Sequence, residues 1–252
     1  LLTVLMGPSG AAVIDCNGNG EADTVDIEAG VSADCNGNAI PDECDGSPLG
    51  FSDVQDVSPV SDSPRVLAVG DLDGDGALDM VAGTLGSRTS TLAVLINRGD
   101  TTFDDPVEYT PPGSHDSGRN VYSLVTGDFD DDGDLDVATA NSVVILMWFN
   151  QGDGALDSPV SYPVSGDGDA RFVAAVDVHR DGYLDLVTAN RKAHTISVRA
   201  NQGDGSFDAP VDFAVGNSPA SIATDDFNGD GRQDVATSNA GDFSILLNQG
   251  AG

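Results

Sequence analysis

The sequence predicts an all-β fold of β-propeller type, built from repeated four-stranded blades of which four are recognisable. An acidic loop recurs four times, and its first aspartates, Asp71, Asp128, Asp177 and Asp226, are 57, 49 and 49 residues apart. Short apolar runs with strand-like alternation flank each loop, and no helical periodicity occurs in this region. A β-solenoid is the alternative, but solenoid coils are usually shorter than about 50 residues.

Residues 51–252 divide into four units with a common order of segments. The units open at Phe51, Phe103, Leu156 and Phe207, and in three of them an extended segment follows, at residues 106–109, 159–162 and 210–213. One apolar run then precedes the acidic loop, a second follows it, and a third lies just before the turn that closes the unit. Turns rich in Asn and Gly close the units, because these residues tolerate positive φ. We therefore expect four strands per unit, beginning with the extended segment.

Each acidic loop has a glycine at position 6 and oxygen ligands at positions 1, 5 and 9, and three of the four also have one at position 3. This pattern suits calcium. The strongest candidates are the first two loops, with Asp71, Asp73, Asp75, Asp79 and with Asp128, Asp130, Asp132, Asp136. The fourth loop offers Asp226, Asn228, Asp230 and Asp234, and the third offers Asp177, Asp181 and Asp185. Main-chain carbonyls at position 7 belong to Ala77, Asp134, Tyr183 and Arg232. Turns without metal are the alternative.

The third loop departs from this pattern because His179 replaces an oxygen ligand and Arg180 adds positive charge. Imidazole suits softer metals than calcium, so we expect this site to be weak or empty. Recruitment of zinc by His179 is a less favoured alternative.

Residues 15–46 are predicted to form a small irregular module with two calcium-type loops. The ligand positions of the first loop are Asp15, Asn17, Asn19, Glu21, Asp23 and Asp26, and those of the second are Asp34, Asn36, Asn38, Ile40, Asp42 and Asp45. Ala39 replaces the glycine at position 6 of the second loop, which should weaken that site. Residues 1–14 are expected to be a strand or linker remnant.

The three cysteines, Cys16, Cys35 and Cys44, all lie in this first module. An odd number leaves one thiol over, and Cys35 and Cys44 can pair within their own loop copy. Their position among calcium-type loops favours an extracellular, oxidising setting.

The chain has 42 acidic and 10 basic residues, a net charge of −32. This charge argues against nucleic acid and anionic membrane surfaces as partners. No apolar run approaches the ~18–20 residues of a membrane span. Unneutralised carboxylates in the loops repel one another, so we expect Ca²⁺ binding to be coupled to stability.

The repeats resemble the FG-GAP/VCBS repeats of integrin α-type propellers. The resemblance rests on Val-Thr-Gly-Asp-Phe-Asp-Asp-Asp-Gly-Asp-Leu-Asp at 125–136 and on Asn-Gln-Gly-Asp-Gly-Ser-Phe at 201–207, with their counterparts in the other units. It implies structural calcium in a hairpin loop of each blade, and rings of about six to eight blades. With four blades recognisable, three alternatives stay open: part of a longer propeller, an open array that associates with another copy, or a closed ring of four.

Two further resemblances concern the N-terminal region. Residues 15–45 resemble thrombospondin type 3 repeats and, less closely, dockerin loops, but residues 24–29 are too short for a dockerin helix. Cohesin binding is therefore not expected. Leu1–Met6 resembles the last strand of a blade, so it is a candidate for completing a ring.

These patterns favour a secreted or cell-surface module that binds or adheres to a protein or glycan, and no enzymatic activity is expected. The histidines are His115, His179 and His194, and no nucleophile motif accompanies them. Arg98-Gly99-Asp100 is interpreted as a closing turn. The aromatic residues Tyr122, Trp148, Tyr162 and Tyr183 are expected mostly to pack between blades rather than to stack on sugar rings.

Two alternatives to this function remain. An accessory or catalytic domain of a polysaccharide-degrading hydrolase or lyase is implied by the family resemblance, and Arg191, Lys192, His194 and Arg199 are its thin basic cluster. A passive surface spacer is the other alternative.

Overall fold

The computed structural model describes residues 63–84, 90–100, 102–112, 120–166 and 168–250, together with the backbone of 3–6 and 12–15. The chain divides into two compact units, Leu1–Asp56 and Val57–Gly252. The predicted N-terminal calcium loops lie outside the described residues apart from Asp15, whose backbone alone is described.

In the first unit, strand β1 (Thr3–Met6) pairs antiparallel with β2 (Ala12–Asp15), with Thr3 opposite Asp15. These two strands form a sheet of their own. That Leu1–Met6 completes a ring of blades stays a prediction.

The second unit consists of four antiparallel sheets, called blades 1 to 4 below. Blade 1 contains β3 (Pro64–Gly70), β4 (Asp79–Thr84), β5 (Leu92–Leu95) and β6 (Val107–Tyr109). Blade 2 contains β7 (Ser123–Gly127), β8 (Asp136–Ala140), β9 (Val144–Trp148) and β10 (Val160–Pro163). Blade 3 contains β11 (Ala170–Val176), β12 (Asp185–Asn190), β13 (Thr195–Arg199) and β14 (Val211–Ala214). Blade 4 contains β15 (Ser221–Asp225), β16 (Asp234–Ser238) and β17 (Phe243–Leu246).

The all-β fold of repeated propeller-like blades is thus confirmed, but the predicted start of each unit is wrong by one strand. Strands β6, β10 and β14 pair with β5, β9 and β13, so the extended segments end a blade rather than begin the next one. The closing turn joins the third and fourth strands as a hairpin, with bridges such as Asn150 to Leu156. As a consequence, blade 4 has three strands among the described residues.

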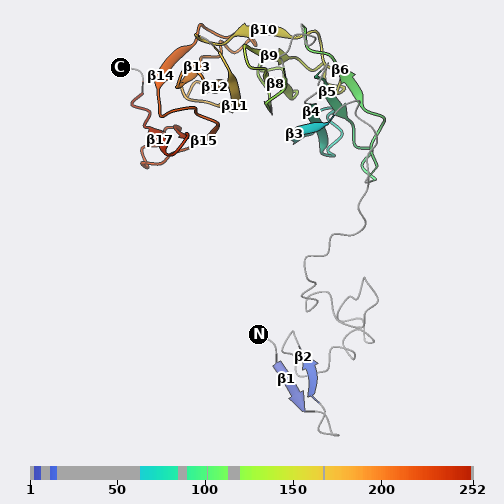
Figure 1. The fold of residues 1–252 in the computed structure, drawn as a ribbon. Helices are drawn as coiled ribbons and strands as arrows, with labels where there is room; N and C mark the ends of the chain where they lie inside the picture. The colour runs from blue at the N-terminus through green and yellow to red at the C-terminus, as the bar shows by residue number, and fades with distance from the viewer. Residues whose placement is uncertain are drawn as a thin grey trace. The chain divides into compact units, whose positions relative to one another are not determined.

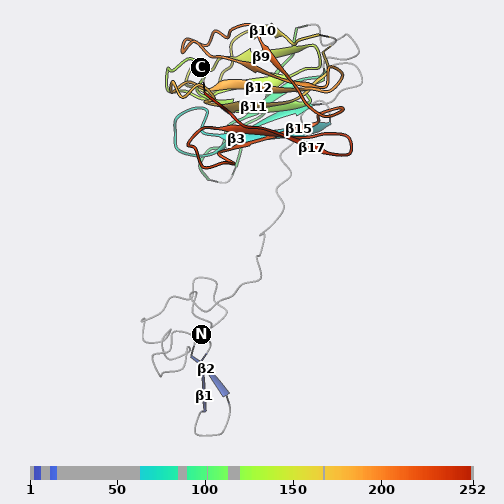
Figure 2. The ribbon, with the colours of Figure 1, turned by 90° about the vertical axis from the view of Figure 1, so that its left-hand side faces the viewer.

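The blades follow one another in chain order along an arc (Figure 1), and Figure 2 shows the same sheets from the side. The innermost strands β3, β7, β11 and β15 lie beside one another in that order. Gly70 permits close approach, since a Cβ at this position would lie 2.6 Å from Leu135 Cδ1 of blade 2.

The hydrophobic core lies between neighbouring blades. Blades 1 and 2 share a cluster that includes Leu92 and Trp148, blades 2 and 3 share one with Ile145 and Phe207, and blades 3 and 4 share one with Ile196 and Val235. Each blade is therefore stabilised mainly by its neighbours, as expected for a repeat architecture. Within the described part of the chain, no helix is long and apolar enough to cross a membrane.

Candidate metal centres

The acidic loops connect the first and second strands of each blade, and the aspartate at position 9 begins the second strand. These aspartates, Asp79, Asp136, Asp185 and Asp234, have 0% exposure. In each, Oδ2 accepts a hydrogen bond from the main-chain N–H at position 2 of the loop, at 2.7, 3.0, 3.0 and 3.1 Å. Oδ1 accepts one from the N–H of the closing-turn asparagine, at 2.7, 2.9, 2.9 and 2.7 Å. One carboxylate therefore joins the loop to the closing turn.

Loops 1 and 2 bring three aspartates together at positions 1, 3 and 9. The groups are Asp71, Asp73 and Asp79, and Asp128, Asp130 and Asp136, in each of which one carboxylate oxygen per residue lies within 4.8 Å of the others. Asp71 Oδ1, Asp128 Oδ1 and Asp130 Oδ1 are buried and lack a hydrogen-bond partner. Because buried oxygens without a partner are costly, a hard cation is the missing partner that these oxygens fit.

The electrostatics of the two triads point the same way. Burial raises the pKa of Asp73 and that of Asp130, and repulsion from neighbouring aspartates adds to the rise. Burial also raises the pKa of Asp136 to about 7, although two main-chain N–H donors oppose it. A cation among these carboxylates would favour their ionised forms and so offset the cost of burial and repulsion.

The aspartates at position 5 lie outside the triads. Asp75 and Asp132 are exposed, and their Oδ1 atoms accept hydrogen bonds from the N–H groups of Ala77 and Asp134, at 2.7 and 2.9 Å. Their role as ligands, and that of the position 7 carbonyls, stays a prediction.

In loop 3, the imidazole of His179 stands at position 3, where loops 1 and 2 have a carboxylate. His179 Nδ1 lies 2.8 Å from Asp185 Oδ2, and the oxygens of Asp177 accept hydrogen bonds from the N–H groups of Asp181 and Gly182. Loops 1 and 2 also have the Gly N–H bond to the first aspartate, so the His179–Asp185 contact is what distinguishes loop 3, and the expected weak site stays a prediction.

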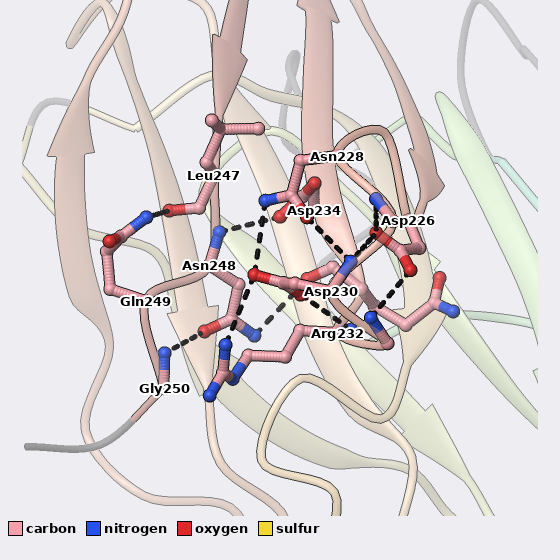
Figure 3. A network of polar contacts seen from close by, with 12 residues as sticks. Asp226, Asn228, Asp230, Arg232, Asp234, Leu247, Asn248, Gln249 and Gly250 are labelled. Atoms are coloured by element: carbon pink, nitrogen blue, oxygen red, sulfur yellow. Dashed lines mark hydrogen bonds and ion pairs between the residues drawn. The ribbon is translucent and has the colours of Figure 1, made fainter.

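Loop 4 carries positive charge close to its acidic groups (Figure 3). Arg232 Nη1 lies 3.1 Å from Asp230 Oδ2, and Asn228 Nδ2 donates to the same oxygen at 3.2 Å. Hydrogen bonds from main-chain N–H groups, chiefly that of Gly231, lower the pKa of Asp226. Two of the predicted ligands of this loop, Asn228 and Asp230, are thus in direct contact with each other.

The closing-turn asparagines join neighbouring blades, a role that the sequence pattern did not predict. Asn150 Nδ2 donates to the carbonyls of Leu135 in its own blade and Leu72 in the preceding loop, at 3.1 and 2.6 Å. Asn201 and Asn248 repeat this arrangement, bonding Phe129 O and Val178 O of the preceding loops, both at 2.8 Å. Asn recurs after the third strand of every blade, and this recurrence could have indicated the role. The preference of Asn for turns explains the recurrence equally well, so the sequence alone did not distinguish the two.

The structure places the other singled-out side chains as follows. Trp148 and Tyr162 pack between blades, Tyr122 lies beneath the Arg171 guanidinium, and Tyr183 lies close to Gly203. Arg98 pairs with Asp104 in its exposed turn. Arg199 is buried and donates to Asp208 O and Pro163 O, so it is not available to a substrate as the predicted basic cluster would require.

Several predicted residues lie outside the described part of the chain. These are His115, the three cysteines, and the N-terminal ligand candidates Asn17, Asn19, Glu21, Asp23, Asp26, Asp34, Asn36, Asn38, Ile40, Asp42 and Asp45.

The FG-GAP-like repeat family matches the chain three times, at residues 71–139, 128–188 and 179–237. Together these matches cover well over half of the sequence and contain all four acidic loops. The chain therefore belongs to the FG-GAP-like repeat family. No curated protein sequence matches it.

One solved structure, a lectin, agrees with this fold. An Agrocybe aegerita lectin, described by its specific recognition of non-reducing terminal N-acetylglucosamine, matches with a TM-score of 0.54 at 21% identity, over 75% of this chain and 51% of the lectin. BBS1N in complex with ARL6DN matches with a TM-score of 0.47 at 13% identity, over 75% of this chain and 58% of that one. The chain thus spans about half the length of the lectin, and at this identity the likeness shows the fold alone.

Proposed function

We propose that this chain is an extracellular calcium-binding module that presents propeller loops to a protein or glycan ligand. The observation that carries the proposal is the pair of aspartate triads with buried carboxylate oxygens that lack a partner. Oxygen-only ligand sets of this kind suit calcium rather than softer metals. Extracellular calcium modules work with dissociation constants of roughly 10⁻⁴–10⁻³ M, which is within reach of small, partly exposed sites.

Calcium acts structurally in this proposal. The position 9 aspartate of each triad also holds the closing turn, through Asn97 in blade 1 and Asn150 in blade 2. A cation at the triad would therefore stabilise the loop and, through Asn150, the contact between blades 1 and 2. The surface offered to a ligand depends on this stabilisation.

A binding role is favoured over a catalytic one by the placement of the described polar groups. His179 contacts Asp185, and His194 Nδ1 accepts a hydrogen bond from the Ser218 N–H at 2.9 Å. The carboxyls whose pKa is raised, those of Asp73, Asp130 and Asp136, belong to acidic loops 1 and 2. The similarity to a lectin fold makes glycans a reasonable first class of ligand to test.

The test is a glycan array, combined with capture on immobilised extracellular matrix proteins, in millimolar calcium and again in chelator. We expect a defined ligand that is retained in calcium and lost in chelator. Asp130→Asn should weaken retention, whereas Asp131→Asn should not, since Asp131 is exposed and lies beside the triad without belonging to it. Retention that is equal in chelator would contradict the calcium-dependent part of the proposal, and release of sugar fragments during incubation would favour an enzyme.

A further inference from the structure

One buried carboxylate belongs to blade 3 alone, at the place where its innermost strand begins. Asp169 lies just before β11. Aligning the innermost strands at the residues that pair with the position 9 aspartates places Ser63, Asn120 and Ser218 at the corresponding point of the other blades. The position 9 aspartates, by contrast, are buried in every blade. A charged group that the repeat does not require is a candidate for a role in binding.

Groups from two blades converge on this carboxylate. Asp169 is 4% exposed, and Arg171 Nε lies 2.7 Å from its Oδ1. Ser142 Oγ, in blade 2, donates to the same oxygen at 3.2 Å. Arg191 Nη1, in the turn between β12 and β13, lies 3.9 Å from Oδ2. Two arginines thus share one carboxylate, so their combined charge exceeds the charge that it can neutralise.

The Arg171 guanidinium is held from two sides. Arg171 lies at a β-bulge, since the pairing of β11 with β12 shifts between Ala170 and Phe172, and bulges redirect a side chain. Its Cζ lies 3.8 Å from the centre of the Tyr122 ring of blade 2. Stacking on this ring and the ion pair with Asp169 fix the orientation of the guanidinium before any ligand arrives, which reduces the entropy lost on binding.

The backbone around the carboxylate is unusual as well. Ser142 and Asp169 have φ angles of 62° and 74°, in the left-handed region that few residues other than glycine adopt. The Ala170 N–H donates to Ser142 O at 2.7 Å, so the contact between blades 2 and 3 holds this conformation. Backbone of this kind is concentrated at ligand-binding sites, where the surrounding structure maintains it.

Positive charge remains accessible at this place. The side chains of Arg171 and Arg191 are 27% and 52% exposed, and Lys192, which follows in the same turn, is exposed. Among the residues that the structure describes, no further acceptor contacts the terminal nitrogens of either arginine. Because the chain has 42 acidic and 10 basic residues, three cations beside one buried carboxylate form an exceptional region that attracts anions.

We propose that this cluster binds the carboxylate of an acidic sugar, such as a uronic acid residue of a polysaccharide. Planar guanidinium groups match a carboxylate with two parallel hydrogen bonds. The Tyr122 hydroxyl accepts a hydrogen bond from Asn120 Nδ2 at 3.2 Å, so its own proton is available to a ligand. Hydroxyl groups on Tyr122 and Ser142 favour a sugar over an acidic peptide, because a sugar offers hydroxyls beside its carboxylate. The inference rests on the proposed function, since it names a class of glycan for that binding module.

The test is calorimetric titration of the calcium-loaded chain with tri-galacturonate, with maltotriose as the neutral sugar and triglutamate as the acidic peptide. We expect tri-galacturonate to bind and the other two compounds not to bind. Arg171→Gln and Arg191→Gln should each weaken the binding of tri-galacturonate at least about tenfold, because each removes a charged donor. Melting curves establish that both variants fold.

Arg98→Gln is the matched control and should bind as the wild type does. It removes the same charge from an exposed arginine that pairs with an aspartate, Asp104. Gln also stands at the corresponding place in the closing turns of blades 2 and 3, as Gln151 and Gln202.

Three results would overturn the proposal: a wild type that does not bind tri-galacturonate, equal binding by the wild type and both cluster variants, or tighter binding of triglutamate. Its failure is distinct from that of the proposed function. Another glycan or protein that is retained in calcium and lost in chelator would leave the proposed function intact. Binding of tri-galacturonate that depends on the two arginines but persists in chelator would support this site and contradict the calcium dependence.

Discussion

Two residues organise each repeat, the aspartate that begins the second strand and the asparagine that follows the third. The aspartate is buried in all four blades and receives hydrogen bonds on both oxygens. In loops 1 and 2 the same residue belongs to a candidate metal triad. Because the structural role and the proposed metal-binding role share one carboxylate, we expect metal binding to be coupled directly to loop geometry.

Loop 3 allows this interpretation to be tested by a gain of binding. His179→Asp restores a carboxylate at position 3, beside Asp177 and Asp185, and removes the imidazole that contacts Asp185. We expect calorimetric titration with calcium to yield one more site per chain than the wild type, with a higher melting temperature in calcium. His179→Asn serves as the neutral comparison and should gain less. An unchanged number of sites in His179→Asp would show that the backbone of loop 3 prevents binding.

The raised pKa of Asp136 predicts a pH dependence for the calcium-free protein. Its carboxyl keeps a proton up to about pH 7 in the folded state, whereas in the unfolded chain it ionises near its ordinary pKa of 3.8. Between these values unfolding releases a proton, so the free energy of unfolding falls as pH rises, by up to about 1.4 kcal/mol per pH unit from this group. Urea unfolding in chelator from pH 4.5 to 7 measures this slope.

Asp136→Asn is the control for that measurement, because its side-chain amide does not titrate. The slope of the variant should be smaller than that of the wild type by the contribution of this one group. Identical slopes would mean that Asp136 ionises at the same pH in the folded and unfolded chain.

At the scale of strands and turns, the closing hairpin is the element that joins neighbouring blades. Asn150 bonds carbonyls of two blades and is 1% exposed, whereas Asn97 of blade 1 bonds Leu78 O of its own blade. Hairpins of blades 2 and 3 also insert Leu156 and Phe207 between blades. The hairpin therefore belongs structurally to two blades at once.

This difference predicts unequal effects for the same substitution. Asn150→Ala leaves Leu72 O and Leu135 O without their buried donor, and we expect it to lower the free energy of unfolding by roughly 2–4 kcal/mol. Asn97→Ala removes an exposed bond and should cost less than about 1 kcal/mol. Chemical denaturation of both variants in calcium compares them. Equal losses would show that the bond to the preceding blade adds nothing.

The sequence predicted most strands correctly because alternation and turn residues are local signals. It placed residues 106–109 in the wrong blade. Alternation shows that a segment is a strand but not which neighbour it pairs with, so β6 fitted the strand before it and the strand after it equally well. The hairpin between Asn97 and Phe103 decides the matter in favour of β5. The same shift explains why blade 4 has three strands among the described residues.

At the scale of the whole molecule, the sequence identified the acidic loops but could not rank their residues by geometry. Positions 1, 3 and 9 converge in loops 1 and 2, while Asp75 and Asp132 at position 5 turn to their own main chain. The second role of position 9 and the bridging asparagines depend on contacts between residues far apart in the chain, which spacing does not reveal. Because the net charge is −32, we expect cation binding in these loops to raise the stability of the whole protein.

The measurement that tests this account most directly is calorimetric titration with calcium of the chelator-stripped wild type, Asp130→Asn and Asp131→Asn. These variants remove the same charge one residue apart, and Asp130 alone belongs to a triad. The account predicts that Asp130→Asn loses one calcium ion per chain and part of the calcium-induced rise in melting temperature, while Asp131→Asn matches the wild type. Equal numbers of sites in all three proteins would contradict it.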